Sequence, residues 1–157
     1  MALPNADDEN LSNLSLLVRT DFSNDDAWSR LQESLAQPSI VDGFKANLYF
    51  VSSPESYDQA PIPAVLAAAR AAGFMYFFIA DQQTISEPEQ AILVVDCETE
   101  ASFRVLPRAM WDVENNLSIC NCDFEDYLAD LNASGVYTAS WMDAVPPRNN
   151  NAAPVDE

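Results

Sequence analysis

The sequence predicts a single α/β domain built on a mixed sheet of about five strands. Three observations carry this prediction. Short apolar runs alternate with amphipathic stretches of helical period. Turn and cap residues lie between these runs and stretches. The linker at residues 82–89 is short. A parallel return needs a connection of a dozen or more residues, so this linker favours an antiparallel one. We expect a βαβαβ core followed by an antiparallel hairpin, with helices packed on the sheet.

The strands are predicted from runs rich in aromatic and branched aliphatic side chains. The run at 74–80 (FMYFFIA) is almost uniformly apolar, as expected for a central strand that is covered on both faces. Residues 102–106 instead alternate apolar and polar side chains, as a hairpin partner does. The predicted strands cover residues 14–19, 47–51, 74–80, 90–96 and 102–106.

Helices are expected where apolar residues recur at helical spacing. Ser23 and Asp26 resemble a capping box before the first helix, and Gly73 occupies the position that follows the end of the second. A Phe124 to Leu131 stripe predicts a last helix that Gly135 closes. The predicted helices begin near residues 23, 62, 107 and 124.

Both ends of the chain differ in composition from the middle. Residues 1–13 are acidic and polar, and residues 146–157 combine proline with a run of asparagines. Such segments bury too little apolar surface to offset the entropy of ordering. We therefore expect one domain over residues 14–145, between a disordered N-terminus at 1–13 and a disordered tail at 146–157.

The composition excludes several enzyme classes. The 157 residues include no histidine and only three glycines. A histidine-based triad and a His-ligated zinc are therefore excluded, and a Gly-rich phosphate loop or a GxGxxG dinucleotide turn is unsupported. The 25 acidic and seven basic residues give a net charge of −18, which repels nucleic acids and anionic membranes and attracts basic proteins. We expect a basic protein partner, with no nucleic acid and no membrane; no oligomeric state is indicated.

The three cysteines favour the cytoplasm. The N-terminus has no basic and apolar leader pattern, and no run approaches the roughly 18 apolar residues of a membrane helix. An odd number of cysteines cannot pair fully, so we expect free thiols. Cys120 and Cys122 lack the usual zinc spacing, and we expect neither a metal nor a cofactor.

Two aspartates are the candidate catalytic residues. Asp21 and Asp81 each follow a predicted parallel strand, so both should lie at the edge where open α/β sheets bind ligands. Carboxylates there can bind Mg²⁺ or form an acid and base pair, with Thr20, Ser23 and Thr84 as further oxygen ligands. The other interpretation is that each aspartate is a turn or N-cap residue.

A second candidate site lies in the segment 111–124. Asn115, Asn116 and Asn121 are polar residues set among tryptophan, leucine, isoleucine and phenylalanine, so they are candidate binding residues. Asparagine is also favoured at helix ends and turns, which is the alternative explanation. The scarce arginines, among them Arg19 and Arg104, are expected to form ion pairs that hold the fold rather than an anion site.

Several runs carry a resemblance to a known family. They are LLVRTDFSNDDAW (16–28), ILVVD (92–96), FRVLP (103–107) and VENNLSICNCDFEDY (113–127). Together they resemble a family of small proteins classed as domain of unknown function 6924, from the first strand to about Gly135. The chain departs from that pattern at Gln82, where the family has a basic residue, and around Cys120 to Cys122. The resemblance implies no activity and no catalytic residue.

Two function hypotheses follow, with a structural role in an oligomer as a third. The first is a non-enzymatic module, of the inhibitor or immunity type, that binds a basic protein. The alternative is a Mg²⁺-assisted enzyme that uses Asp21 and Asp81 at the sheet edge. Salt-sensitive binding favours the first hypothesis, and metal-dependent thermal stabilisation favours the second.

Overall fold

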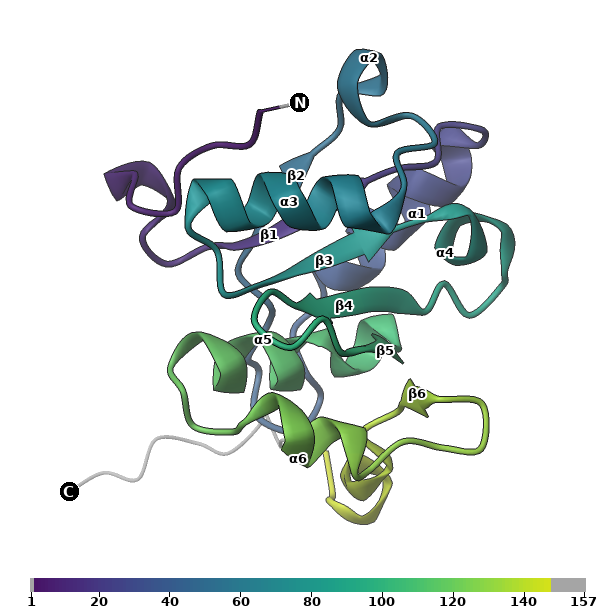
Figure 1. The fold of residues 1–157 in the computed structure, drawn as a ribbon. Coiled ribbons are helices and arrows are strands. Elements are labelled where there is room, and N and C mark those ends of the chain that lie inside the picture. The colour runs from purple at the N-terminus through teal and green to yellow at the C-terminus, as the bar shows by residue number, and fades with distance from the viewer. Residues whose placement is uncertain (1, 148–157) are drawn as a thin grey trace, which may run out of the picture.

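A six-stranded mixed sheet is the centre of the fold in the computed structural model, which describes residues 2–147 (Figure 1). The strands are β1 (Ser15–Arg19), β2 (Leu48–Val51), β3 (Tyr76–Ala80), β4 (Ile92–Asp96), β5 (Ser102–Val105) and β6 (Val136–Tyr137). They lie in the order β2-β1-β3-β4-β5-β6. Strands β2, β1 and β3 are parallel, β4 is antiparallel to both neighbours, and β6 is parallel to β5. The predicted mixed α/β sheet is therefore confirmed, with one strand more than the approximate number expected.

The helices cover both faces of the sheet. They are α1 (Asp25–Leu35), α2 (Pro54–Tyr57), α3 (Ile62–Ala72), α4 (Gln82–Ser86), α5 (Met110–Ser118) and α6 (Phe124–Leu128). Short 3-10 turns add η1 (Glu9–Leu11), η2 (Pro107–Ala109) and η3 (Ser140–Ala144). Figure 1 shows α3 lying across β1 and β3, while α1 and α5 belong to the opposite layer.

Side chains of the central strands point alternately to the two faces of the sheet, and each face has its own hydrophobic core. All five residues of β1 are buried, and its side chains alternate between the faces. Leu16 packs with α3 in one core, whereas Leu17 and Phe78 pack with α1 and α5 in the other. The second core is the larger and includes Trp28, which is 7% exposed. A strand covered on both faces thus explains the continuous apolar runs in the sequence.

Local signals at the helix ends agree only in part with the structure. Gly73 ends α3 with a φ of 89°, the left-handed conformation predicted for that position. Asn24, rather than Ser23, caps α1, because its side chain accepts a hydrogen bond from the Ala27 N–H. The linker at residues 82–89 contains the short helix α4 but no crossover, and β4 returns antiparallel as predicted.

The N-terminal segment differs from the disorder predicted for it. Leu11 is 6% exposed, and Leu3 packs against the core that α3 covers. The Ala6 N–H donates to the Ala72 carbonyl at 2.8 Å, and the Tyr57 hydroxyl donates to the Ala2 carbonyl at 2.8 Å. The few apolar residues in an acidic segment are therefore sufficient to hold it on the domain. Of the predicted C-terminal disorder, residues 148–157 lie outside the described residues.

The region after α5 also differs from the sequence prediction. Helix α6 ends at Leu128 instead of continuing to Leu131. The Asn132 side chain accepts hydrogen bonds from the backbone N–H groups of Ser134 and Val136, which forms a turn into β6. A strand of two residues leaves too little periodicity to be found in a sequence. Within residues 2–147, no helix combines the length and apolar character needed to cross a membrane.

Candidate functional site

The two candidate aspartates follow neighbouring strands at one edge of the sheet. Arg19 at the end of β1 pairs with Ala80 at the end of β3, and the Thr20 N–H donates to the Ala80 carbonyl at 3.0 Å. Thr20 and Asp21 therefore leave β1 beside the point where Asp81 leaves β3. The topology places these residues at the edge that the sequence singled out.

Asp21 serves the turn between β1 and α1. Its side chain is 3% exposed and accepts hydrogen bonds from the backbone N–H of Ser23, at 3.0 Å, and from the Ser23 hydroxyl. Its backbone carbonyl accepts from Arg19 Nε at 2.8 Å. The neighbouring Thr20 carbonyl accepts from the Gln59 N–H at 2.9 Å. These contacts are those of an aspartate that closes a turn.

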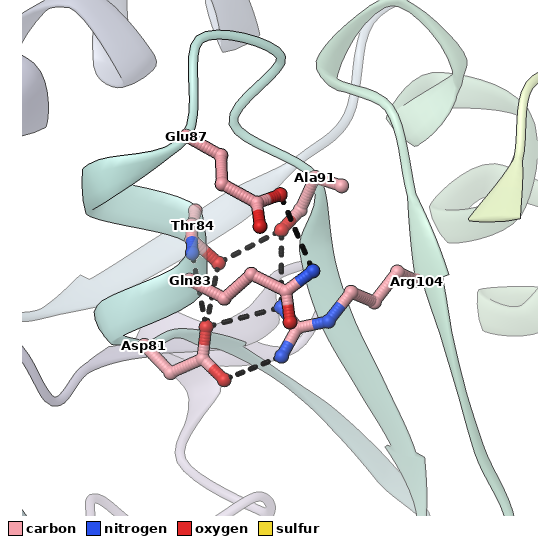
Figure 2. A network of polar contacts seen from close by, with 6 residues as sticks. All are labelled: Asp81, Gln83, Thr84, Glu87, Ala91 and Arg104. Atoms are coloured by element: carbon pink, nitrogen blue, oxygen red, sulfur yellow. Dashed lines mark hydrogen bonds and ion pairs between the residues drawn. The ribbon is translucent and has the colours of Figure 1, made fainter. Parts of the chain in front are cut away.

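Asp81 is the centre of a polar network that joins three elements (Figure 2). It caps α4 by accepting from the Thr84 N–H at 3.1 Å, and the Thr84 hydroxyl lies 3.0 Å from the same oxygen. Arg104 reaches it from β5 across β4 and donates through Nη1 at 3.0 Å and Nη2 at 2.6 Å. Arg104 Nη1 also donates to the Ala91 carbonyl at 3.2 Å. Both carboxylate oxygens of Asp81 are therefore engaged by protein donors.

The network keeps Asp81 ionised. Partial burial raises the pKa of this carboxyl, but the hydrogen bonds from Arg104 and Thr84 and the positive charge of Arg104 outweigh burial and lower the pKa below its ordinary value. A carboxylate stabilised in this way is a weak base. The geometry is that of a helix cap and an ion pair.

The other arginines also form ion pairs. Arg19 is 4% exposed and donates to Asp25 at 2.8 Å, while its guanidinium carbon lies 4.3 Å from the ring centre of Phe22 and 5.2 Å from that of Trp28. Arg108 pairs with Asp143 at 3.1 Å. The ion pairs predicted for the arginines are present at these positions.

The structure separates Asn115 from the other two candidate asparagines. Asn115 Nδ2 donates to Glu114 Oε2 at 2.8 Å and to the Lys45 carbonyl at 3.1 Å. Asn121 Nδ2 instead donates to Asn116 Oδ1 at 2.8 Å. Asn116 Nδ2 then donates to the side chain of a buried aspartate, Asp112, at 2.8 Å. Asn121 and Asn116 thus form a chain of hydrogen bonds that ends at Asp112.

Asp112 borders a hollow of about 270 Å³, which we name the Asp112 hollow. Its walls come from α5, α6, β6 and η3 and combine carboxylates with aromatic rings. Asp112 is 8% exposed and also accepts a hydrogen bond from the Tyr137 hydroxyl. None of the ion pairs found among residues 2–147 includes Asp112. The hollow is lined by Asp112, Cys122, Asp126, Tyr127, Asp130, Tyr137 and Trp141.

Hydrogen bonds order the aromatic wall of the Asp112 hollow. Trp141 Nε1 donates to the Tyr137 hydroxyl at 3.2 Å, and the Tyr127 hydroxyl donates to the Asp112 carbonyl at 3.1 Å. Burial, and then the hydrogen bond to Asp112, raise the pKa of Tyr137. Burial and the Asp112 charge likewise raise the pKa of Tyr127. Both phenols therefore remain protonated donors at neutral pH.

An apolar groove of about 510 Å³ lies next to the Asp112 hollow. Trp111 lines the groove and Trp141 lines the hollow, and their ring centres are 6.1 Å apart in an edge-to-face arrangement. The Arg108–Asp143 ion pair also borders the groove. Apolar residues that line it include Leu35, Ile40, Leu106, Met110, Trp111 and Met142.

The sequence identifies two residues beside the Asp112 hollow, Asn116 and Asn121. It does not identify Asp112, the buried acid to which Asn116 is hydrogen-bonded. The available signal is the spacing of Asp112 and Asn116, which places two polar side chains one turn apart on the same helix face. Tyr137 carries no such signal, because its strand has only two residues. In the part of the chain that the structure describes, no three His, Cys, Asp or Glu side chains could together hold a metal ion.

Comparison with known proteins identifies a family. The model of the family described as Domain of unknown function (DUF6924) matches residues 14–140. A search of curated proteins finds no match. The family match begins just before β1 and ends in η3. It therefore includes the whole sheet and every lining residue of the Asp112 hollow except Trp141. The chain belongs to the family of Domain of unknown function 6924.

Proposed function

We propose that this chain is a non-enzymatic protein-binding module, of the inhibitor or immunity type, that docks a basic protein through the surface around η3. The observation that carries the proposal is the adjacency of the apolar groove and the acidic, aromatic Asp112 hollow, joined by Trp111 and Trp141. Protein interfaces commonly combine a buried apolar and aromatic centre with a polar rim.

The charge distribution supports a basic partner. Four of the seven basic residues, Arg19, Arg70, Arg104 and Arg108, are held in ion pairs within the fold. Helix α6 and its flanks add Asp123, Glu125, Asp126 and Asp130, all exposed, beside the Asp112 hollow. A surface of this sign accelerates encounter with a positively charged protein and selects against acidic ones.

The sheet edge offers less support for the alternative, a Mg²⁺-assisted enzyme. Both oxygens of Asp81 accept hydrogen bonds from Arg104 or Thr84, and Asp21 Oδ1 accepts from Ser23. A cation there would compete with the Arg104 guanidinium, whose Nη2 lies 2.6 Å from Asp81 Oδ2. The free thiols of Cys97, Cys120 and Cys122 support a cytoplasmic setting for the proposed interaction.

Affinity purification from the cytosol of the source organism tests the proposal. The tagged chain is used as bait at about 50 mM and about 500 mM NaCl, beside a bait in which Trp141→Ala removes the exposed ring of the surface around η3. We expect a stoichiometric basic protein that the parent chain retains at low salt and releases at high salt, and that the altered bait loses. Equal retention by both baits, or an acidic partner, would contradict the proposal.

A further inference from the structure

We infer that the Asp112 hollow is a receptor for a guanidinium group, presented as an arginine side chain by the basic partner. The inference rests on the proposed function and assigns the chemistry of one contact within it. The hollow has two properties that an acidic surface alone does not have: a concave shape of about 270 Å³ and a wall of aromatic rings. That volume is slightly below the range of whole-ligand sites, about 300–1,000 Å³, so it suits the head of one side chain.

The aromatic wall favours an organic cation. Trp141 is 42% exposed, so part of its ring is open to a ligand. Tyr127 and Tyr137 are 5% and 4% exposed and stand edge to face with ring centres 4.9 Å apart. Trp141 is hydrogen-bonded to Tyr137, so Trp141 supplies the ring face that a cation can reach. Aromatic faces attract cations, tryptophan most strongly, and they suit weakly hydrated groups better than hydrated metal ions.

The carboxylates supply the complementary charge. Asp112 is 8% exposed, accepts hydrogen bonds from Asn116 Nδ2 and from the Tyr137 hydroxyl, and takes part in none of the ion pairs found among residues 2–147. Both carboxylate oxygens of Asp112 are therefore engaged within the fold, so the direct ligands of an incoming cation would be the exposed acids of the hollow. Asp126 and Asp130 are exposed at the same hollow, and Asp126 uses one oxygen to accept from the Asp123 N–H at 2.8 Å.

The same chain already binds a guanidinium in this manner. Arg19 lies over the rings of Phe22 and Trp28 and donates to the Asp25 carboxylate. A planar guanidinium can stack on a ring and hydrogen-bond a carboxylate at once, whereas an ammonium group is a compact and strongly hydrated charge. The mixed aromatic and acidic wall of the Asp112 hollow therefore favours arginine over lysine.

Nuclear magnetic resonance with defined peptides tests the inference on the full chain. Each of the three tryptophans should contribute one indole N–H signal, and buried Trp28 serves as an internal control. The probes are acetyl-Gly-Arg-Gly-amide, the lysine peptide, and the citrulline peptide, which has the shape of arginine without its charge. We expect a saturable shift of the Trp141 signal with the arginine peptide, in the millimolar range, at least about threefold weaker affinity for the lysine peptide, and no shift with citrulline.

Matched variants separate a local site from the general negative field. Asp130→Asn should weaken binding of the arginine peptide about fivefold or more. Glu98→Gln removes the same charge from an exposed position after β4 and should change affinity less than twofold. Equal weakening by both variants, an equal response to citrulline, or no Trp141 shift at all would overturn the inference. A larger shift with MgCl₂ at the same ionic strength would also overturn it, in favour of a metal site.

The two proposals fail in different ways. If the basic partner binds in a salt-dependent manner but Asp130→Asn leaves that binding intact and the peptides leave Trp141 unshifted, the receptor is wrong and the binding module stands. If the arginine peptide shifts Trp141 as expected but no basic protein is retained, the receptor stands and the proposed partner is wrong.

Discussion

Replacing Asp81 with asparagine removes one negative charge from the network of Figure 2 while keeping the cap of α4. Asparagine is about as good an N-cap as aspartate, so the hydrogen bond to the Thr84 N–H is retained. Arg104, whose side chain is 17% exposed, loses the counter-ion that lies 2.6 Å away. Breaking a fully buried pair costs about 3–5 kcal/mol, and an exposed pair is worth about 0–1 kcal/mol. At 17% and 23% exposure, we expect a loss of about 2 kcal/mol.

Equilibrium unfolding in urea at pH 7 measures this loss. Asp81→Ala removes the cap as well and should cost about 1 kcal/mol more than Asp81→Asn. In a double-mutant cycle with Arg104→Gln, the double variant should lose about 1–2 kcal/mol less stability than the sum of the two single variants, because the residues share one interaction. A loss below about 0.5 kcal/mol for Asp81→Asn would refute the reasoning, since that is the range of ordinary surface substitutions.

The same variant predicts a pH dependence. Because the pKa of Asp81 is lower in the folded protein than its ordinary value, the unfolded chain takes up a proton first as the solution is acidified. The stabilisation is complete above the ordinary pKa of about 3.9 and is lost as the pH falls through the folded pKa. The difference in unfolding free energy between parent and Asp81→Asn should therefore shrink below about pH 4. A constant difference down to pH 2 would contradict the assignment.

Further substitutions test other parts of the fold, each by urea unfolding. Gly73→Ala should cost about 1–2 kcal/mol, because φ is 89° there and a residue with a Cβ is strained in that conformation; an unchanged midpoint would contradict this. Leu11→Ala should cost about 2 kcal/mol, since Leu11 is 6% exposed, and a neutral effect would restore the prediction of N-terminal disorder. Tyr137→Phe removes a hydrogen bond to buried Asp112 and should cost about 1–2 kcal/mol; greater stability than the parent would show that this bond is unfavourable.

The parts of the fold that follow from local pattern could be predicted from the sequence. Strands β1 and β3 are buried on both faces, and this burial requires the continuous apolar runs that mark them. The antiparallel β4 follows from the length of the linker after Asp81, which holds the short α4 but no crossover. Gly73 was identifiable because few other residues adopt the left-handed conformation at a helix end.

The parts that depend on tertiary register could not be predicted. Asp81 and Arg104 are 23 residues apart and meet only because β4 and β5 align Leu93 with Arg104. Strand β6 adds two residues whose pairing with β5 has no periodic signal. The N-terminal segment has an acidic composition, yet a few apolar contacts such as that of Leu11 hold it in place. The Asp112 hollow combines segments from α5 to η3, so composition identified one part of it and not its shape.

The association rate of the chain with the basic protein that it retains is the most direct test of the proposed function. Stopped-flow measurements at about 20 mM and about 200 mM NaCl compare the parent with Asp130→Asn and with Glu98→Gln. If a charged surface around η3 docks the partner, the association rate constant should fall about tenfold or more over this range, and Asp130→Asn should lower it more than Glu98→Gln. A rate constant that is independent of salt and equal in all three proteins would contradict the account.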